Sequence, residues 1–428
     1  MKAQTDQSQP NQIANAENMV AIGIDWADRE HAFHAFDAEG NEWADAFEQT
    51  PEAIDGWVAG LRERWPGATF HVCIEQSKGA LISALLMHDC FRIFPINPTQ
   101  LANYRKAMNH GGSKNDPNDA RLLVQFLLHY GDQLRPLEPG DQATRKLAIL
   151  VRDRRRIVDQ RTAVALELKA TLKQYFPLVL QLVQSNVYAQ FICRLLLKWP
   201  TLEKLQAARP TTLRNFFYGQ NLRGDHVEEK LERIAQAKPL TTDRVILETY
   251  ARRVQRLVRL LLVDADAIAG YDREIKTLLE EHIDFQIVES LPGAALQMRS
   301  RIIAALGTDR QRFASAESLQ SSSGIAPVTS QSGNTRIVSH RWAAPKFVKQ
   351  TFHEYASLSI AKSAWAKAYY QLMLSRKKKP QMAKRALAFK WQRIIFRCWQ
   401  DGVPYDESRY IARLREKNSP LLAFMDTK

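Results

Sequence analysis

Cysteine is scarce in this chain of 428 residues, and its four cysteines lie far apart in the sequence. None belongs to a CxxC pair, so the pattern offers neither a zinc site nor a disulfide framework and is typical of a protein in a reducing cytoplasm. No stretch approaches the ~18 uncharged apolar residues of a membrane-spanning helix. Residues 1–18 lack the apolar segment of a signal peptide and predict a flexible tail. We therefore expect a cytoplasmic protein without a membrane segment.

Basic residues are also few in the first third of the chain. Residues 1–150 contain 13 Lys and Arg against 20 Asp and Glu, whereas the remaining residues contain 47 against 26. A basic surface binds a polyanion partly by releasing condensed counterions, so the excess beyond residue 150 favours nucleic acid as a partner. An acidic region inside such a protein is explained if its carboxylates gather around metal ions.

Strand and helix patterns alternate in the acidic third. Residues 20–37 predict a β-hairpin, because an apolar run and an alternating run flank a turn. Further strands are expected at 69–74 and 91–94, and helices at 54–64, 79–87, 98–108 and 117–130. This alternation indicates an α/β domain. The proline- and glycine-bearing segment 135–141 predicts its end.

Long amphipathic helices are expected at 142–182 and 242–279, with a shorter mixed region between them. Their length indicates an antiparallel helical hairpin or a coiled coil at a subunit interface. Residues 336–428 differ again, with 20 Lys and Arg against 6 Asp and Glu, interleaved with aromatic residues. We expect four parts, namely a tail at 1–18, an α/β domain at 19–141, a helical coiled-coil region at 142–285 and a mainly α domain at 286–428.

Four carboxylates occupy positions where metal sites form. Asp25 and Glu75 each close an apolar strand, and the active sites of α/β sheets lie at such strand ends. Asp116 and Asp119 stand three residues apart at a predicted helix start and share a face. Converging carboxylates repel unless cations separate them, and Mg²⁺ takes oxygen ligands while leaving positions open for phosphates. Taken singly, each acid is better explained as a turn or helix-cap residue, so only the four together favour a metal site.

The same residues resemble a known family. Strand-ending Asp25 and Glu75 and the segment Lys114-Asn-Asp-Pro-Asn-Asp-Ala120 are similar to the DEDD transposases of bacterial insertion sequences. This is the insertion-sequence one-ten family, whose members are relatives of the Piv site-specific invertase. The resemblance covers nearly the whole chain beyond residue 18. It implies an RNase H-like, RuvC-like fold for the N-terminal domain and Mg²⁺ or Mn²⁺ bound by Asp25, Glu75, Asp116 and Asp119.

The C-terminal part resembles the transposase domain of that family. The segments that carry this resemblance are Leu291-Pro-Gly293 with Ile302–Gly307, Ser323–Pro327, Gln331-Ser-Gly333, Arg341–Phe347 and Gln350–Glu354. Ala295 stands where the family has a second glycine in a helix-hairpin-helix-like segment. In the family a serine of this domain attacks DNA, which implies Ser332 as the nucleophile, with Ser330 and Ser323 as alternatives.

From composition alone, residues 329–334 are an ordinary Ser-Gly-rich loop. A serine hydroxyl is a poor nucleophile unless it is activated. Arg336, His340, Arg341 and Lys346 could neutralise a phosphate nearby, although spacing assigns a role to none of them. The runs Arg376–Lys379 and Lys384-Arg385 are either a solvated charge cluster or contacts to phosphate.

These observations predict a DNA recombinase that breaks and rejoins the element ends and target in double-stranded DNA through a transient phosphoserine. A covalent intermediate conserves the energy of the phosphodiester, which fits a chain without a Walker-type loop. The resemblance further implies a structured bridge RNA, and the long helices predict a homo-oligomer, a dimer or a tetramer. Two alternatives stay open. A structure-selective nuclease such as a junction resolvase would use only the carboxylates, and a non-catalytic nucleic-acid-binding protein would cut no strand.

Overall fold

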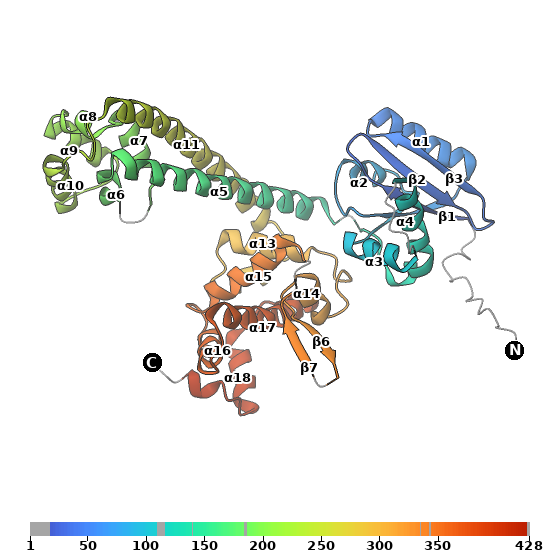
Figure 1. The fold of residues 1–428 in the computed structure, drawn as a ribbon. Coiled ribbons are helices and arrows are strands. Elements are labelled where there is room, and N and C mark those ends of the chain that lie inside the picture. Colours follow the sequence, from blue (N-terminus) through green and yellow to red (C-terminus); the bar gives the residue numbers. More distant parts are fainter. Residues whose placement is uncertain are drawn as a thin grey trace. The chain divides into compact units, whose positions relative to one another are not determined.

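A computed structural model describes residues 18–108, 116–138, 140–183, 186–333, 335–341 and 344–425. The chain divides into two compact units, Met1–Pro139 and Gly140–Lys428, which we call the sheet unit and the helical unit and describe separately (Figure 1). Except for Asn18, the predicted tail at 1–18 lies outside the described residues. None of the helices within the described ranges is long and apolar enough to cross a membrane.

The sheet unit contains one five-stranded sheet in the order β3-β2-β1-β4-β5. Its strands are β1 (Met19–Asp25), β2 (Glu30–Phe36), β3 (Glu42–Glu48), β4 (Thr69–Ile74) and β5 (Phe91–Pro95). The pairs β1–β2 and β2–β3 are antiparallel, whereas β4 runs parallel to both β1 and β5. The predicted hairpin and both later strands are confirmed. The edge strand β3 was not predicted, because it is charged and largely exposed and so lacks the buried pattern of its neighbours.

Helices cover both faces of this sheet. One face packs against α1 (Pro51–Arg64) and α2 (Ala80–Leu85), whose apolar side chains share a core with Ile22, Ile24 and Ile74. The opposite face carries α3 (Pro98–Met108) and α4 (Asp116–Tyr130), packed on Ala21, Cys73 and Phe94. A short 3-10 turn, η2 (Gly131–Gln133), follows α4. All four predicted helices are confirmed, and the N-terminal domain is a mixed α/β layered fold.

Two long helices run side by side in the helical unit, α5 (Gln142–Tyr175) and α11 (Arg244–Glu280). Lys146 pairs with Glu274 at 2.7 Å, and Glu167, farther along α5, pairs with Arg253 at 3.8 Å. Since later residues of one helix contact earlier residues of the other, the pair is antiparallel, as predicted. Asp141 and Asp243 cap the two N-termini through their side chains.

Five short helices connect the ends of this pair. They are α6 (Leu178–Leu182), α7 (Gln190–Lys198), α8 (Leu202–Gln206), α9 (Pro210–Gly219) and α10 (Asp225–Gln236). Their apolar side chains form one core with the adjoining part of α5 and α11. The region predicted as mixed is therefore helical and builds a core of its own.

The C-terminal part of the helical unit is a helical bundle with one hairpin. Its elements are α12 (Phe285–Glu289), α13 (Leu296–Leu306), α14 (Ala316–Ser322), β6 (Val328–Ser332), β7 (Thr335–Ser339), α15 (Lys346–Ser359), α16 (Ala364–Ser375), α17 (Pro380–Asp401), α18 (Glu407–Glu416) and η3 (Leu422–Phe424). Trp365, Trp391 and Trp399 are fully buried at its centre. Of the segment 329–334, predicted as a loop, residues 329–332 instead belong to β6 and pair with β7, and Asn334 lies outside the described residues.

Candidate active site

Asp25 and Glu75 lie at neighbouring ends of parallel strands. Asp25 is the last residue of β1, and Glu75 directly follows the last residue of β4. The two strands pair in register up to Ile24 and Ile74. Because paired strands are about 4.8 Å apart, the two acids leave the sheet next to each other, as the strand ends predicted.

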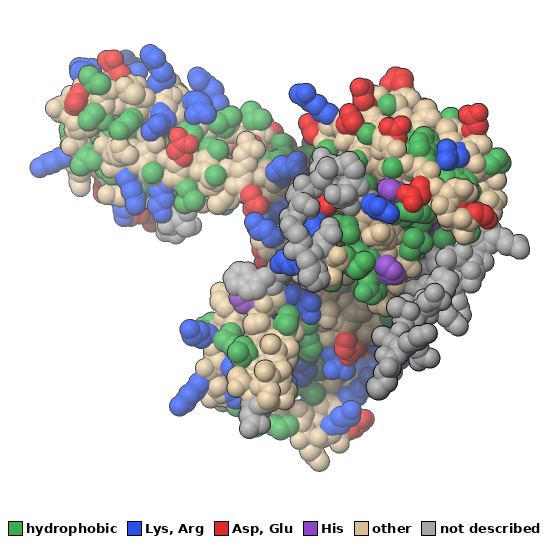
Figure 2. Space-filling view, turned by 45° about the vertical axis from the view of Figure 1, so that its right-hand side comes forward, with side chains coloured by type: hydrophobic (Ala, Val, Ile, Leu, Met, Phe, Trp, Pro, Cys, Tyr) green, Lys and Arg blue, Asp and Glu red, His purple; other side chains and the backbone are tan. Residues whose placement is uncertain are grey.

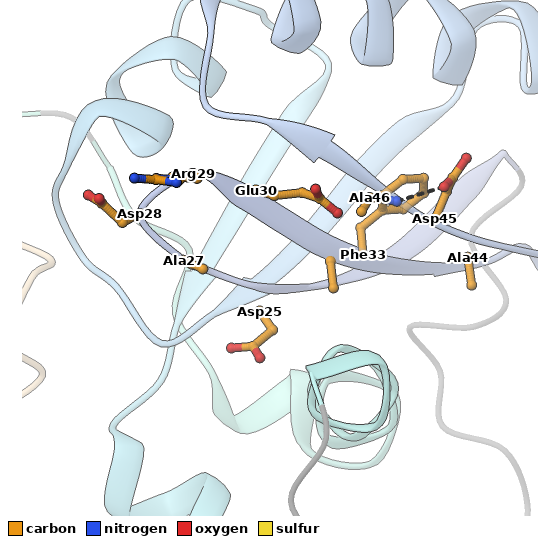
Figure 3. Close-up of a pocket in the computed structure, with 10 residues that line it drawn as sticks. Asp25, Ala27, Asp28, Arg29, Glu30, Phe33, Ala44, Asp45 and Ala46 are labelled. Atoms are coloured by element: carbon orange, nitrogen blue, oxygen red, sulfur yellow. Dashed lines mark hydrogen bonds between the residues drawn. The ribbon is translucent and has the colours of Figure 1, made fainter.

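Both acids belong to the α3–α4 face of the sheet. Ala21, Gly23 and Asp25 alternate onto one side of β1, and Ala21 and Cys73 are buried in the core beneath α4. Glu75 stands two residues after Cys73 and so continues the same side of β4. Burial raises the pKa of the Cys73 thiol strongly, and the negative charge of Glu75 raises it further. Figure 3 shows Asp25 projecting from the strands toward the helix drawn in teal, α4.

A glycine brings α4 against this face. A β-carbon added to Gly23 would lie 2.0 Å from the carbonyl oxygen of Ala120 and 2.6 Å from the amide nitrogen of Val124. Only glycine allows so close an approach between a strand and a helix backbone. Asp119, which precedes Ala120, is thereby held beside the strand that ends in Asp25.

Asp119 is 3% exposed and forms an ion pair with Arg105 of α3. The Arg105 Nε donates to Asp119 Oδ1 at 3.0 Å, and its Nη2 lies 2.7 Å from the same oxygen. A buried carboxylate is costly unless a cation or several donors compensate it. Arg105 supplies that compensation. Sequence reasoning missed Arg105, because no spacing pattern links it to Asp119.

The side chain of Asp116 lies outside the described residues. Among the side chains that the structure does describe, no three His, Cys, Asp or Glu residues form a group that could hold a metal ion. Mg²⁺ commonly binds through one or two carboxylates and takes its remaining ligands from water and substrate phosphates. The adjacent pair Asp25 and Glu75 therefore fits such an ion in donor chemistry and number.

An acidic cleft opens beside Asp25. It has a volume of about 730 Å³ and its lining includes Asp25, Asp28, Arg29, Glu30 and Asp45 (Figure 3). Four carboxylates against one guanidinium repel a nucleic-acid backbone unless cations intervene. On the face drawn in Figure 2, acidic side chains crowd the sheet unit, whereas Lys and Arg project from the long helices of the helical unit.

Ser332 ends β6 and pairs with Thr335, so it lies at the turn of an exposed hairpin. Gly333 follows with φ +54°, a left-handed conformation that suits a tight hairpin turn. Ser330 lies on the same side of the strand, two residues earlier. Arg336 pairs with Gln331 and therefore belongs to the opposite side of the hairpin from Ser332.

Ser323, the other alternative nucleophile, is fully buried. Its Oγ donates to the Gln320 carbonyl at 3.0 Å and accepts from Gln392 Nε2 at 2.7 Å. This serine holds α14 against α17 and does not reach solvent. The exposed hairpin thus leaves Ser332 and Ser330 as the accessible candidates.

Comparison with known proteins matches two separate parts of the chain to family models. Residues 22–177 match the family model for the DEDD transposase of IS110 elements, and residues 285–371 match the model described as transposase, IS116/IS110/IS902 family. A protein of Streptomyces coelicolor, named for the transposase of the IS117 mini-circle, is 27% identical over 92% of this chain and 97% of its own length. The 42 kDa protein of insertion element IS900 from Mycobacterium paratuberculosis is 24% identical over 79% of this chain and 84% of its own length.

These matches define the class of protein as a transposase of an insertion element. The strand-end acids Asp25 and Glu75 and the buried Asp119 all lie within the first of the two matched segments. The chain belongs to the IS110 family of insertion-sequence transposases, as the sequence resemblance predicted.

Proposed function

We propose that this transposase breaks and rejoins DNA through a phosphoserine at Ser332, assisted by metal-binding carboxylates of the sheet unit. The observation that carries the proposal is that Asp25 and Glu75 leave the sheet on the face that α4 covers, and that Asp119 of α4 is buried against the same face. Asp25 and Glu75 lie at the ends of adjacent parallel strands. Asp119 lies on α4, which can approach the sheet closely because Gly23 has no side chain. A purely structural role does not require this convergence.

The proposed fold of the sheet unit is RNase H-like. Three antiparallel strands, followed by two parallel strands added on the β1 side, support it. We also keep the predicted boundaries 19–141, 142–285 and 286–428. The helices that connect α5 and α11 have a core of their own with the adjoining part of that pair, whereas Leu147, Val151, Ile275 and Leu279 of the pair share the core of the C-terminal bundle across the boundary at 285.

In this proposal Asp25, Glu75, Asp116 and Asp119 hold Mg²⁺ or Mn²⁺. When bound, the metal supplies positive charge beside the scissile phosphate. Asp25 and Glu75 present carboxylate oxygens at the open end of the sheet, next to the acidic cleft. Arg105 fixes the orientation of Asp119 through its two contacts with Oδ1.

The proposed step at Ser332 is a transesterification. The Ser332 Oγ forms a bond to phosphorus while the phosphorus bond to one strand oxygen breaks, and the serine proton is passed on as the departing oxygen gains one. Attack by a strand hydroxyl in the reverse sense releases the serine and restores a phosphodiester, so no nucleotide cofactor is consumed. The two hairpin strands contain no carboxylate, histidine or lysine. The groups that activate Ser332 must therefore come from outside the hairpin.

The proposed partners are double-stranded DNA at the element ends and target, a bridge RNA and further copies of this chain, in the bacterial cytoplasm where that DNA lies. The basic excess of the helical unit supports a polyanionic partner. Exposed apolar side chains on α5 and α11 support self-association, among them Leu166 at 64% and Val263 at 66% exposure.

The proposal is tested by comparing Ser332→Ala with Ser330→Ala, its neighbour on the same side of the hairpin. Recombination of a plasmid that carries the element ends should disappear with Ser332→Ala and persist with Ser330→Ala, while both variants bind DNA. Normal recombination by Ser332→Ala would contradict the proposal.

A nuclease that uses only the carboxylates is the second candidate. The absence of carboxylate, histidine and lysine side chains from the hairpin strands favours it. Under that function Ser332→Ala would leave cleavage intact, and the products would be hydrolysed ends.

A further inference from the structure

A second cleft, of about 460 Å³, lies in the helical unit between α15 and α17, and we call it the basic cleft. Its polar lining comes from the first turns of both helices. These residues are Lys346, Lys349, Gln350 and His353 of α15 and Gln381 and Arg385 of α17. No carboxylate is among the described residues that line it.

The spacing of these residues explains why they share the cleft. The four residues of α15 stand at i, i+3, i+4 and i+7, and the two of α17 stand at i and i+4, so each set occupies one helix face. Both sets begin within a turn of a helix N-terminus, in helices of 14 and 22 residues. The positive ends of two helix dipoles therefore add to the side-chain charge.

The nearest acid on this face of α15 is already bound. Glu354 pairs with the buried guanidinium of Arg301 and accepts a hydrogen bond from Gln350 Nε2 at 2.7 Å. Burial, and then the charge of Arg385, lower the pKa of Lys349. Burial also lowers the pKa of His353, and Arg385 and Lys384 contribute, while a hydrogen bond with Gln381 and the charge of Glu354 oppose the shift. The cations thus repel one another, and an anion would relieve that repulsion.

The basic cleft lies at the base of the hairpin that carries Ser332. Ile325, in its lining, stands three residues before β6. After β7, Lys349 Nζ donates to the carbonyl oxygen of Arg341 at 2.7 Å. Ser332 stands four residues after Val328 along β6, a length of about 13 Å at about 3.3 Å per residue. A phosphate in the cleft is therefore a different phosphate from the one that Ser332 would attack.

We propose that the basic cleft binds a backbone phosphate of the DNA strand that Ser332 attacks, several nucleotides from the scissile position, and so sets the register of that strand on the hairpin. The inference rests on the proposed function, because Ser332 identifies DNA as the strand in question. Lysine, arginine and amide donors around two helix N-termini match the oxygens of a phosphodiester. The cleft residues position DNA and do not take part in the chemistry.

The test is the salt dependence of DNA binding, measured with duplex DNA of unrelated sequence in a Ser332→Ala background. Lys346→Gln with Arg385→Gln removes two cleft cations and keeps the Lys349 contact to Arg341. Arg393→Gln with Arg397→Gln removes two cations farther along α17 and is the matched control. The magnitude of the slope of log K against log salt should fall by about 1 in the cleft variant, because each phosphate contact contributes about 0.9 to that slope. An unchanged slope, or an equal fall in the control, would overturn the proposal.

A second readout is the titration of His353, followed by NMR of histidine-labelled full-length protein. Addition of the same DNA should raise the His353 pKa, since a bound phosphate favours its charged form. The assignment to DNA would be refuted if DNA did not raise the His353 pKa. It would also be refuted if the cleft variant lowered the slope of log K against log salt for RNA of equal length but not for DNA. Normal recombination by Ser332→Ala would instead refute the proposed function, whatever the cleft variants show.

Discussion

The sheet unit and the helical unit have opposite charge. Residues 1–139 contain 11 Lys and Arg against 19 Asp and Glu, whereas residues 140–428 contain 49 against 27. The first unit gathers carboxylates on one face of a sheet, and the second provides cations, an exposed serine and a basic cleft. In our account the charge that binds the DNA backbone and the carboxylates that act on it are separated between units, so strand breakage requires both.

The largest effect is expected from the acids of the sheet unit. Asp25→Asn and Glu75→Gln should each lower strand breakage by about 10²–10³-fold or more, as loss of a preorganised electrostatic contact does in other active sites. Binding of DNA by the helical unit should persist. Breakage is measured on labelled element ends with Mg²⁺ and again with chelator, which should abolish it.

Asp45→Asn is the matched control, because Asp45 lines the same acidic cleft but lies on the edge strand β3. It should retain most activity. If folded Asp25→Asn and Glu75→Gln proteins cut at the wild-type rate, the sheet unit does not carry the chemistry.

The sequence predicted those parts of the fold in which burial leaves a pattern. The apolar runs of β1 and β4 and the amphipathic patterns of α5 and α11 are visible in the sequence, because each element buries apolar side chains. The edge strand β3 and the β6–β7 hairpin are not, since exposed polar strands carry no such pattern.

The candidate site was predictable to a similar degree. Strand ends located Asp25 and Glu75, but the Arg105–Asp119 pair and the meeting of α15 with α17 depend on tertiary packing, which no local spacing encodes. The role of Gly23 is also tertiary, since only the contact with α4 shows why a side chain is excluded there.

Gly23→Ala tests the contribution of the sheet unit separately from that of the helical unit, because the substitution perturbs the sheet unit alone. The added methyl would meet the backbone of α4 at 2.0 Å, so strand and helix must separate. We expect a loss of about 1–3 kcal/mol in the free energy of unfolding. Thermal or denaturant unfolding of the full chain measures this loss.

Gly56→Ala provides the control, because nothing lies within 4 Å of a β-carbon at that position in α1. It should stabilise the protein by up to about 1 kcal/mol. Equal effects of the two substitutions would show that α4 does not press on Gly23.

Self-association should depend on the helical unit. Leu166→Glu with Val263→Glu places charge on exposed apolar positions of α5 and α11 and should weaken the oligomer at least about tenfold, which is about 1.4 kcal/mol. Light scattering over a concentration series measures the change. Ile283→Glu, at a position 82% exposed outside both helices, should have no effect. A wild-type protein that stays monomeric with nucleic acid bound would contradict this prediction.

The smallest effect is expected at the cap of α5. Partial burial alone would raise the pKa of Asp141, but hydrogen bonds from Thr144 and Thr308 together lower it from 3.8 to about 2. Because the folded pKa is depressed, the stabilisation is present above pH 3.8 and is lost as the pH falls through about 2. Asp141→Ala should cost about 1 kcal/mol at neutral pH, and less in acid.

Thr308→Val keeps the cap and removes only the hydrogen bond to Asp141 Oδ2, so its cost should be smaller than that of Asp141→Ala. Unfolding free energies measured between pH 2 and pH 7 compare the two variants. A cost of Asp141→Ala that does not change with pH would show that the charge of Asp141 is not involved.

The covalent intermediate is the most direct test of the division between the units. Full-length protein is allowed to react with DNA that carries the element ends, the reaction is stopped by denaturation, and the nucleotide-bearing peptide is identified by mass spectrometry after digestion. We predict a phosphodiester adduct on Ser332 that is absent from Ser332→Ala and strongly reduced in Asp25→Asn. An adduct on another residue, or cleavage of DNA with no adduct at all, would contradict the account.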